Sequence, residues 1–188
     1  TLTRLLNRDD VFSSLHSNEI DNLKIFDEHS IPKLETVLRM FPDMKFQIDV
    51  KTDEVAMPAL AIIQKNNAMD RVCIASFNSK RLNLVNNNYP DICISMGPYE
   101  VAKMLLSSFG LYKKSILGNC LQIPIYEYGI KLVTKRFVKF IHSKGLKVCV
   151  WTINDEKTFK YLIDLGVDGI ITDKPKLLFE VLDSATNQ

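Results

Sequence analysis

Residues 147–153 read Lys-Val-Cys-Val-Trp-Thr-Ile, an apolar run rich in β-formers that predicts a strand. Asn154 or Asp155 then supplies a helix cap, and an amphipathic stretch continues until Gly166 ends it. A second β-rich run, Gly-Ile-Ile-Thr-Asp, follows directly at residues 169–173. A strand, a helix and a strand in this order indicate a βαβ unit whose two strands are parallel.

The same alternation extends back through the chain. Further strand-like runs lie at residues 45–51, 71–77, 91–96 and 120–125, and stretches with helical spacing lie at residues 55–64, 80–85, 101–106 and 134–143. The predicted parallel strands fit either an open six-stranded sheet or part of an eight-stranded barrel. Residues 5–30 are polar and irregular, apart from a short helix near Glu19, and are predicted to form a loop or insertion.

Composition narrows the class of protein. The chain has 188 residues, which is the length of one domain. Its 24 basic and 22 acidic residues leave a net charge of +2, which argues against nucleic acid or a membrane surface as the main partner. No stretch reaches the ~18 apolar residues of a membrane span. We therefore expect a single globular domain with no membrane span.

The four cysteines are Cys73, Cys93, Cys120 and Cys149. Each lies in or beside an apolar run, and none belongs to a CxxC pair, so the spacing predicts buried free thiols rather than zinc ligands. Free thiols fit a reducing compartment, and we expect a cytoplasmic protein.

Five stretches resemble motifs of the glycerophosphodiester phosphodiesterase family and occur in the family's order. They are residues 31–38 (Ile-Pro-Lys-Leu-Glu-Thr-Val-Leu), 46–51 (Phe-Gln-Ile-Asp-Val-Lys), 74–77 (Ile-Ala-Ser-Phe), 151–154 (Trp-Thr-Ile-Asn) and 166–175 (Gly-Val-Asp-Gly-Ile-Ile-Thr-Asp-Lys-Pro). Each motif alone is weak, whereas five in order make a specific resemblance.

The resemblance implies a TIM-type (β/α) barrel in the α/β class. On that layout residues 31–188 supply six βα units of an expected eight, strands three to eight, and residues 1–30 are a remnant of the insertion or loop region. The family's His-Arg-Gly, Glu-x-Asp and His-Asp motifs are not found, and Thr1-Leu2-Thr3-Arg4 resembles the Thr-Leu-Asp-Arg that follows the last of them. We therefore expect the chain to begin after those catalytic groups.

The function that the resemblance implies is metal-dependent hydrolysis of small glycerophosphodiesters to glycerol phosphate and an alcohol, in lipid and glycerol metabolism. The implied cofactor is Mg²⁺ or Ca²⁺, hard ions that prefer oxygen ligands. The alternative is a catalytically inactive truncated barrel, or a binding remnant of the same family. The related sphingomyelinase-like phospholipase D branch is secreted and disulfide-bonded, and the scattered cysteines argue against it.

The resemblance also nominates site residues. Asp49 matches a metal carboxylate and Lys51 a catalytic lysine near the phosphate, although an ion pair between these two is the alternative for both. Trp151 matches a substrate-lining tryptophan, with a barrel-core aromatic as the alternative. Ser76 and Phe77, at the end of one strand, are further substrate-binding candidates.

Other polar residues are expected to play structural or solvent-exposed roles. Asp173 is expected to cap the helix that begins near Pro175, His142 to face solvent, and His16 to lie in a polar loop. A barrel without its first two strands would leave open edges on the third and eighth. We therefore expect self-association through exposed strand edges.

Overall fold

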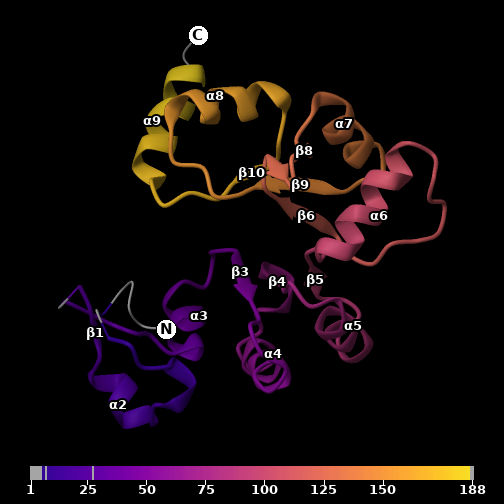
Figure 1. The fold of residues 1–188 in the computed structure, drawn as a ribbon. Coiled ribbons are helices and arrows are strands. Elements are labelled where there is room, and N and C mark those ends of the chain that lie inside the picture. Colours follow the sequence, from indigo (N-terminus) through magenta and orange to yellow (C-terminus); the bar gives the residue numbers. More distant parts are fainter. Residues whose placement is uncertain (1–5, 7, 27, 187–188) are drawn as a thin grey trace.

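The computed structural model describes residue 6, residues 8–26 and residues 28–186, in which helices and strands alternate from α3 onward (Figure 1). The helices are η1 (Phe12–Ser14), α2 (Ser17–Asn22), α3 (Leu34–Met40), α4 (Ala56–Lys65), η2 (Met69–Arg71), α5 (Ser79–Asn88), α6 (Pro98–Ser108), α7 (Lys135–Ser143), α8 (Glu156–Leu165) and α9 (Pro175–Thr186). The strands are β1 (Lys24–Ile25), β2 (His29–Ser30), β3 (Phe46–Asp49), β4 (Val72–Ala75), β5 (Cys93–Ile94), β6 (Cys120–Ile123), β7 (Tyr126–Glu127), β8 (Ile130–Lys131), β9 (Lys147–Val150) and β10 (Gly169–Ile170). Among these residues, no helix combines the length and apolar character needed to cross a bilayer.

The strands that pair across βα crossovers, β3 to β6, β9 and β10, are all parallel, as the sequence predicts. One sheet has the order β3-β4-β5 and a second has the order β10-β9-β6. A parallel bridge between Ser95 and Cys120 joins β5 to β6, where the Met96 N–H donates to the Cys120 carbonyl at 2.8 Å. The strands thus run side by side in chain order, and their carboxyl ends share one edge.

The described residues do not form a closed barrel. β3 pairs with β4 and β10 pairs with β9, and no pairing between β3 and β10 occurs in the described part of the chain. Figure 1 shows the helices on the outer side of both sheets, with the strands facing inward.

Caps fix the helix ends. The Asp155 side chain accepts a hydrogen bond from the Thr158 N–H at 2.9 Å, and Gly166 ends α8 in the left-handed region at φ 79°. Thr134 caps α7 by accepting from the Phe137 N–H at 3.2 Å. The cap and the stop predicted for α8 are therefore confirmed, whereas the Thr134 cap was not predicted.

Two of the predicted strands are longer than the observed ones. Residues 91–96 and 169–173 each contribute only two residues to a strand, Cys93–Ile94 and Gly169–Ile170. Backbone hydrogen bonds continue beyond these strands, since the Ser95 N–H donates to the Ile74 carbonyl and the Ile171 N–H donates to the Val150 carbonyl, both at 2.8 Å. Helix α6 begins earlier than predicted, since Pro98 occupies its first turn, where the absent N–H costs nothing.

Two short antiparallel pairs were not predicted. β1 pairs with β2 in the N-terminal region, where α2 confirms the helix expected near Glu19. β7 pairs with β8 around Tyr128 and Gly129, whose positive φ angles of 47° and 77° fit a tight two-residue hairpin. The Tyr128-Gly129 pair was the sequence signal from which this hairpin turn could have been predicted.

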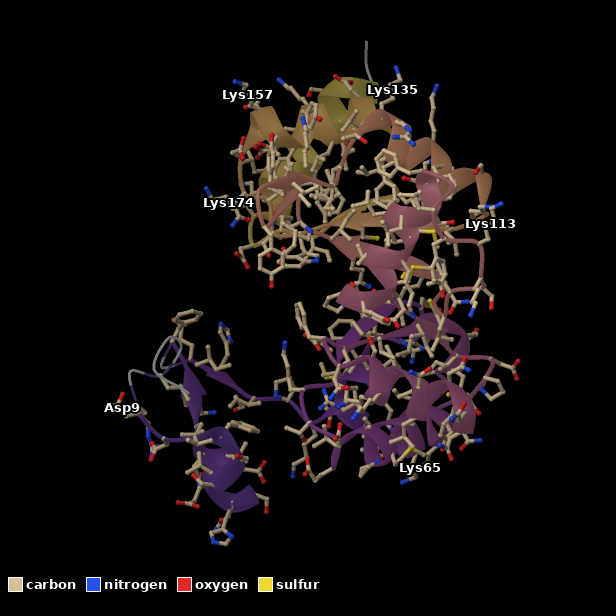
Figure 2. The ribbon with its side chains drawn as sticks, turned by 45° about the vertical axis from the view of Figure 1, so that its right-hand side comes forward. Asp9, Lys65, Lys113, Lys135, Lys157 and Lys174 are labelled. Atoms are coloured by element: carbon tan, nitrogen blue, oxygen red, sulfur yellow. The ribbon has the colours of Figure 1, made fainter. Side chains whose placement is uncertain are left out.

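Side chains on the helix-facing side of the strands form two apolar cores. The first lies between β3–β5 and helices α3–α5, and the second lies between β6, β9, β10 and helices α6–α9. Lys65, Lys113 and Lys135 extend outward around the helical layer, away from these cores (Figure 2). The largest fully buried members are Phe159, Leu38, Leu60, Ile63, Ile74, Leu82, Ile92, Ile94, Leu121, Ile123, Ile141 and Leu162.

The alternate strand residues face away from the helices. In β4, β6 and β9, buried residues alternate with half-buried or exposed ones, as the two-residue period of a strand requires. The four cysteines occupy half-buried positions of β4, β5, β6 and β9. The thiols are free, as predicted, but they are only partly buried, because these side chains face inward and not into the helix-covered cores.

Asp168 joins β9 to the turn before β10. Its carboxylate accepts from the Val148 N–H and pairs with His142 Nε2, both at 2.8 Å, while its own N–H donates to the Val148 carbonyl at 2.8 Å. Burial by itself raises the pKa of Asp168, but the hydrogen bonds from Val148 and His142 and the nearby charges of His142 and Lys147 outweigh it and lower the pKa. His142 is exposed as expected, although it is not free.

Replacing this carboxylate should destabilise the fold. We expect Asp168→Ala to lower the free energy of unfolding by about 1–3 kcal/mol, because the Val148 N–H loses a charge-assisted acceptor. A depressed carboxyl pKa stabilises the folded state above the unfolded pKa of about 3.9, and this contribution is lost as the pH falls further. Urea titration should show the gap between wild type and variant shrinking below about pH 4.

The control is Asp164→Ala, which removes an exposed carboxylate from α8. It should change stability by less than about 0.5 kcal/mol. Equal destabilisation by both variants would contradict the role assigned to Asp168.

Candidate active site

The carboxyl end of β3 presents an ion pair. Asp49 ends β3, and the Val50 N–H donates to the Ala75 carbonyl at 2.8 Å, which keeps the end of β3 beside β4. Asp49 and Lys51 lie on the same side of the chain, and the Lys51 ammonium donates to Asp49 Oδ2. The ion pair considered as an alternative for these two residues is therefore present, and the Lys51 side chain is 71% exposed.

Two aromatic rings extend this site from neighbouring strands. Phe77 follows β4 and Trp151 follows β9, and their rings meet edge to face with centroids 6.2 Å apart and planes at 82°. Lys51 Nζ lies 5.5 Å from the centre of the Phe77 ring. Residues distant in the sequence are thus adjacent at one edge of the sheets, as parallel strand ends require.

A pocket of about 680 Å³ opens beside these residues. Four of the five predicted site residues line this one cavity: Asp49, Ser76, Phe77 and Trp151. The fifth, Lys51, contacts two of them, through its ion pair with Asp49 and its position beside the Phe77 ring. Most of the remaining wall is apolar, and α6, the β7–β8 hairpin and the residues beside them supply much of it. It includes Met96, Pro98, Val101, Ala102, Leu105, Tyr128, Ile130 and Leu132. The site therefore combines a charged rim with an apolar wall.

Ser76 is engaged by the protein itself. Its hydroxyl donates to the Val50 carbonyl at 3.0 Å and accepts from the Asn78 N–H at 3.2 Å and from Arg81 Nη1 at 2.9 Å. Ser76 is only 6% exposed. Its hydroxyl proton is thus committed to a bond between the ends of β3 and β4.

Arg81 is a residue that sequence reasoning missed. From α5 it donates to the Val50 carbonyl at 2.8 Å as well as to Ser76, and Arg81 Nε donates to Asp53 Oδ1 at 2.7 Å. Its side chain is 10% exposed, which is low for an arginine on a helix and indicates a structural role. No local sequence signal marks it, because two of its partners, Val50 and Asp53, come from a different βα unit.

Asp173 is structural, but in a different way from the cap that was expected. Asn154 binds it twice: Asn154 Oδ1 accepts from the Asp173 N–H at 2.9 Å, and Asn154 Nδ2 donates to Asp173 Oδ2 at 3.1 Å. The histidines His16, His29 and His142 are all exposed, and none lines the pocket. His16 contributes its backbone N–H, which donates to Glu19 Oε2 at 2.8 Å in the first turn of α2.

The described residues do not by themselves complete a site for a hard divalent ion. Asp49 and Glu127 are the carboxylates among the pocket-lining residues, and the described residues gather no group of three carboxylates or histidines at ligand distance. Mg²⁺ and Ca²⁺ take six or more oxygen ligands. Asp49 can therefore supply one ligand, and the set around it is too small to hold such an ion.

Comparison with known proteins identifies the family. Residues 1–177 match the model of the glycerophosphoryl diester phosphodiesterase family, and the chain belongs to that family. A probable glycerophosphodiester phosphodiesterase 2 of Mycobacterium tuberculosis is 33% identical over 162 residues, which is 81% of this chain and 60% of that protein. A lysophospholipase D of Rattus norvegicus is 34% identical over 183 residues, with coverages of 82% and 57%. The chain thus spans about three-fifths of the length of the curated relatives it matches.

Solved structures agree on the fold. A phosphodiesterase from Oleispira antarctica, in complex with the product sn-glycerol-3-phosphate, superposes with a TM-score of 0.77 at 18% identity, over 97% of this chain and 76% of that one. A glycerophosphodiester phosphodiesterase from Thermotoga maritima gives 0.69 at 21% identity, over 96% and 75%. The resemblance stated from the motifs is confirmed at the level of family and α/β fold.

Arg81 generates a prediction about how the site is held. We expect Arg81→Ala to lower the free energy of unfolding by about 2–3 kcal/mol, because the Val50 carbonyl and Ser76 hydroxyl lose a nearly buried donor. Arg39→Ala is the control: its partners Glu35 and Asn66 are on the surface, and its loss should cost less than about 1 kcal/mol. Thermal and urea melts of both variants measure the difference, and a smaller loss for Arg81 than for Arg39 would contradict it.

Proposed function

We propose that this protein hydrolyses glycerophosphodiesters to glycerol phosphate and an alcohol. The observation that carries the proposal is the shared pocket, in which Asp49, Phe77 and Trp151 lie beside the Lys51 ammonium at the carboxyl ends of parallel strands. Family membership supports the same reaction class. The solved relative that contains sn-glycerol-3-phosphate supports a product of this kind.

Each residue has a role that its chemistry suits. The Lys51 ammonium is a compact positive charge that can pair with the anionic diester, and its charge can offset the charge that develops on the phosphate oxygens. Phe77 and Trp151 provide an edge-to-face aromatic wall against which the glycerol carbons can pack. Ser76 remains a substrate-binding candidate through its position in the wall, while its hydrogen bonds hold that wall in place.

We also propose that Asp49 contributes one ligand to Mg²⁺ or Ca²⁺. When bound, such an ion neutralises phosphate charge and polarises the phosphorus–oxygen bonds. Asp49 alone binds a hard ion weakly, so the remaining oxygen ligands would have to come from outside the described residues around the pocket. In the absence of the ion, Asp49 holds Lys51 at the rim.

The finer layout from the sequence analysis stays part of this proposal. We propose that residues 31–188 correspond to six βα units, strands three to eight of the family's barrel, with residues 1–30 as the remnant of the insertion. The parallel order from β3 to β10 supports it. The free cysteines support a cytoplasmic location.

Removing the charges tests the proposed roles. We expect Lys51→Met and Asp49→Asn each to cut the hydrolysis of glycerophosphocholine by about a hundredfold or more, with unchanged melting temperature, since both side chains stabilise charge at the phosphate. Lys144→Met is a matched control, because Lys144 Nζ also lies 5.5 Å from an aromatic ring, that of Phe140, outside this pocket.

The alternative of an inactive binding remnant makes a different prediction. Under this alternative, the protein binds sn-glycerol-3-phosphate, and the binding is lost in Lys51→Met. The wild type shows no hydrolysis at any Mg²⁺ or Ca²⁺ concentration. Equal activity of Lys51→Met and Lys144→Met would contradict the role given to Lys51.

Self-association through strand edges is a separate part of the proposal. Within the described residues, β3 and β10 each pair on one side only, which leaves backbone N–H and C=O groups of the other side without a ladder partner. We expect light scattering to show a mass that rises with concentration, and Gln47→Pro in β3 to reduce the rise, because proline removes an edge donor. A constant monomer mass across the concentration range would contradict it.

A further inference from the structure

Three of the four cysteines come together on the inner face of the sheets. Cys73, Cys93 and Cys120 lie on β4, β5 and β6, and their sulfur atoms all lie within 4.8 Å of one another. The Sγ atoms of Cys73 and Cys120 are 3.7 Å apart. Cys73 is directly opposite Cys93 in the parallel register, and Cys120 is bridged to Ser95, the residue that follows β5.

The spacing of the three sulfurs is that of a metal site. With metal–sulfur bonds of about 2.3 Å, three sulfurs in a trigonal site are about 4.0 Å apart, and in a tetrahedral site slightly less. The Cys73–Cys120 separation of 3.7 Å is close to these values, and no two of the three sulfurs are more than 4.8 Å apart. The thiols are half-buried, so an ion can reach them, and no disulfide occupies them.

Lys147 is the residue directly opposite Cys120 in the β6–β9 register, so a cationic side chain belongs to the same face of the sheet. A cation near a cysteine favours the thiolate form that binds a metal ion.

We propose that Cys73, Cys93 and Cys120 form a binding site for a soft, thiophilic metal ion, with Cu⁺ in three-coordinate geometry as the occupant. Soft thiolates select soft ions such as Cu⁺ over Mg²⁺ and Ca²⁺, so this site is chemically distinct from the one proposed at Asp49. Structural Zn²⁺ takes four protein ligands. Cys149, the remaining cysteine, lies outside the group of three, so the cluster lacks a fourth cysteine ligand for Zn²⁺. On binding, each thiol releases its proton to solvent and forms one sulfur–metal bond, with no change of oxidation state.

The site lies one layer beneath the pocket. Two residues further along the same strands, Ala75, Ser95 and Gln122 line the pocket floor, and two strand residues span about 6.6 Å. Gln122 links the layers, since Gln122 Nε2 lies 4.0 Å from Cys120 Sγ and its side chain is also hydrogen-bonded to Gln47. A bound ion would therefore tie β4, β5 and β6 together directly below the pocket and stabilise its floor.

Anaerobic titration with Cu⁺, in competition with a chromophoric Cu⁺ chelator, tests the site. We expect the protein to withdraw one Cu⁺ per chain and to melt at a higher temperature when loaded, because the ion binds the folded state. Cys73→Ser, Cys93→Ser and Cys120→Ser should each weaken binding by more than about a hundredfold, since even the outer partners of a metal ligand are worth 10–100-fold. Cys149→Ser is the matched control, a half-buried cysteine of the same face, and should bind as the wild type does.

A second measurement needs no variant and so does not depend on the folding of the cysteine mutants. In the wild type, Cu⁺ should protect Cys73, Cys93 and Cys120 from alkylation while Cys149 remains reactive, as read by peptide mass spectrometry. The proposal is overturned if no Cu⁺ is withdrawn, if all four cysteines are alkylated at equal rates with and without Cu⁺, or if Zn²⁺ binds more tightly in a manner that requires Cys149.

Discussion

The parallel register of neighbouring strands is the constraint on which the rest of this structure depends. Parallel strands require a crossover, and in this chain a helix supplies it each time, so the carboxyl ends of successive strands all reach one edge. Asp49, Phe77 and Trp151 meet at that edge although they belong to three separate βα units. An antiparallel arrangement of the same runs would have placed them at opposite edges.

The two-residue period of the strands divides the side chains into two populations. Residues such as Ile74, Leu121 and Val148 face the helices and are fully buried, and they account for the two apolar cores. Their neighbours Cys73 and Cys120 face the inner side and stay half-buried. Stability is therefore concentrated on the outer faces, while the chemically reactive side chains collect on the inner faces.

The rim of the pocket is fixed by polar bonds between backbone and side chains. The Val50 carbonyl accepts from both Ser76 and Arg81, and Arg81 also binds Asp53. These bonds join the loop after β3 to the start of α5, so the ion pair of Asp49 and Lys51 rests on a supported loop. A polar cluster of this kind is worth more when complete, because each buried group left without a partner costs free energy.

The amino-acid sequence determined the α/β class, the parallel strands, the helix caps at Asp155 and Gly166, and the family, because these depend on local periodicity, local hydrogen bonds and ordered motifs. It also nominated Asp49 and Trp151 as site residues, through their match to the family's motifs. Tertiary structure alone decided the role of Arg81 and the meeting of Cys73 with Cys120, because their partners are distant in the chain and are brought together by strand register and strand order. Cysteine spacing along the chain could not reveal a thiol cluster whose members occupy three different strands, since sequence separation carries no information about neighbours across a sheet.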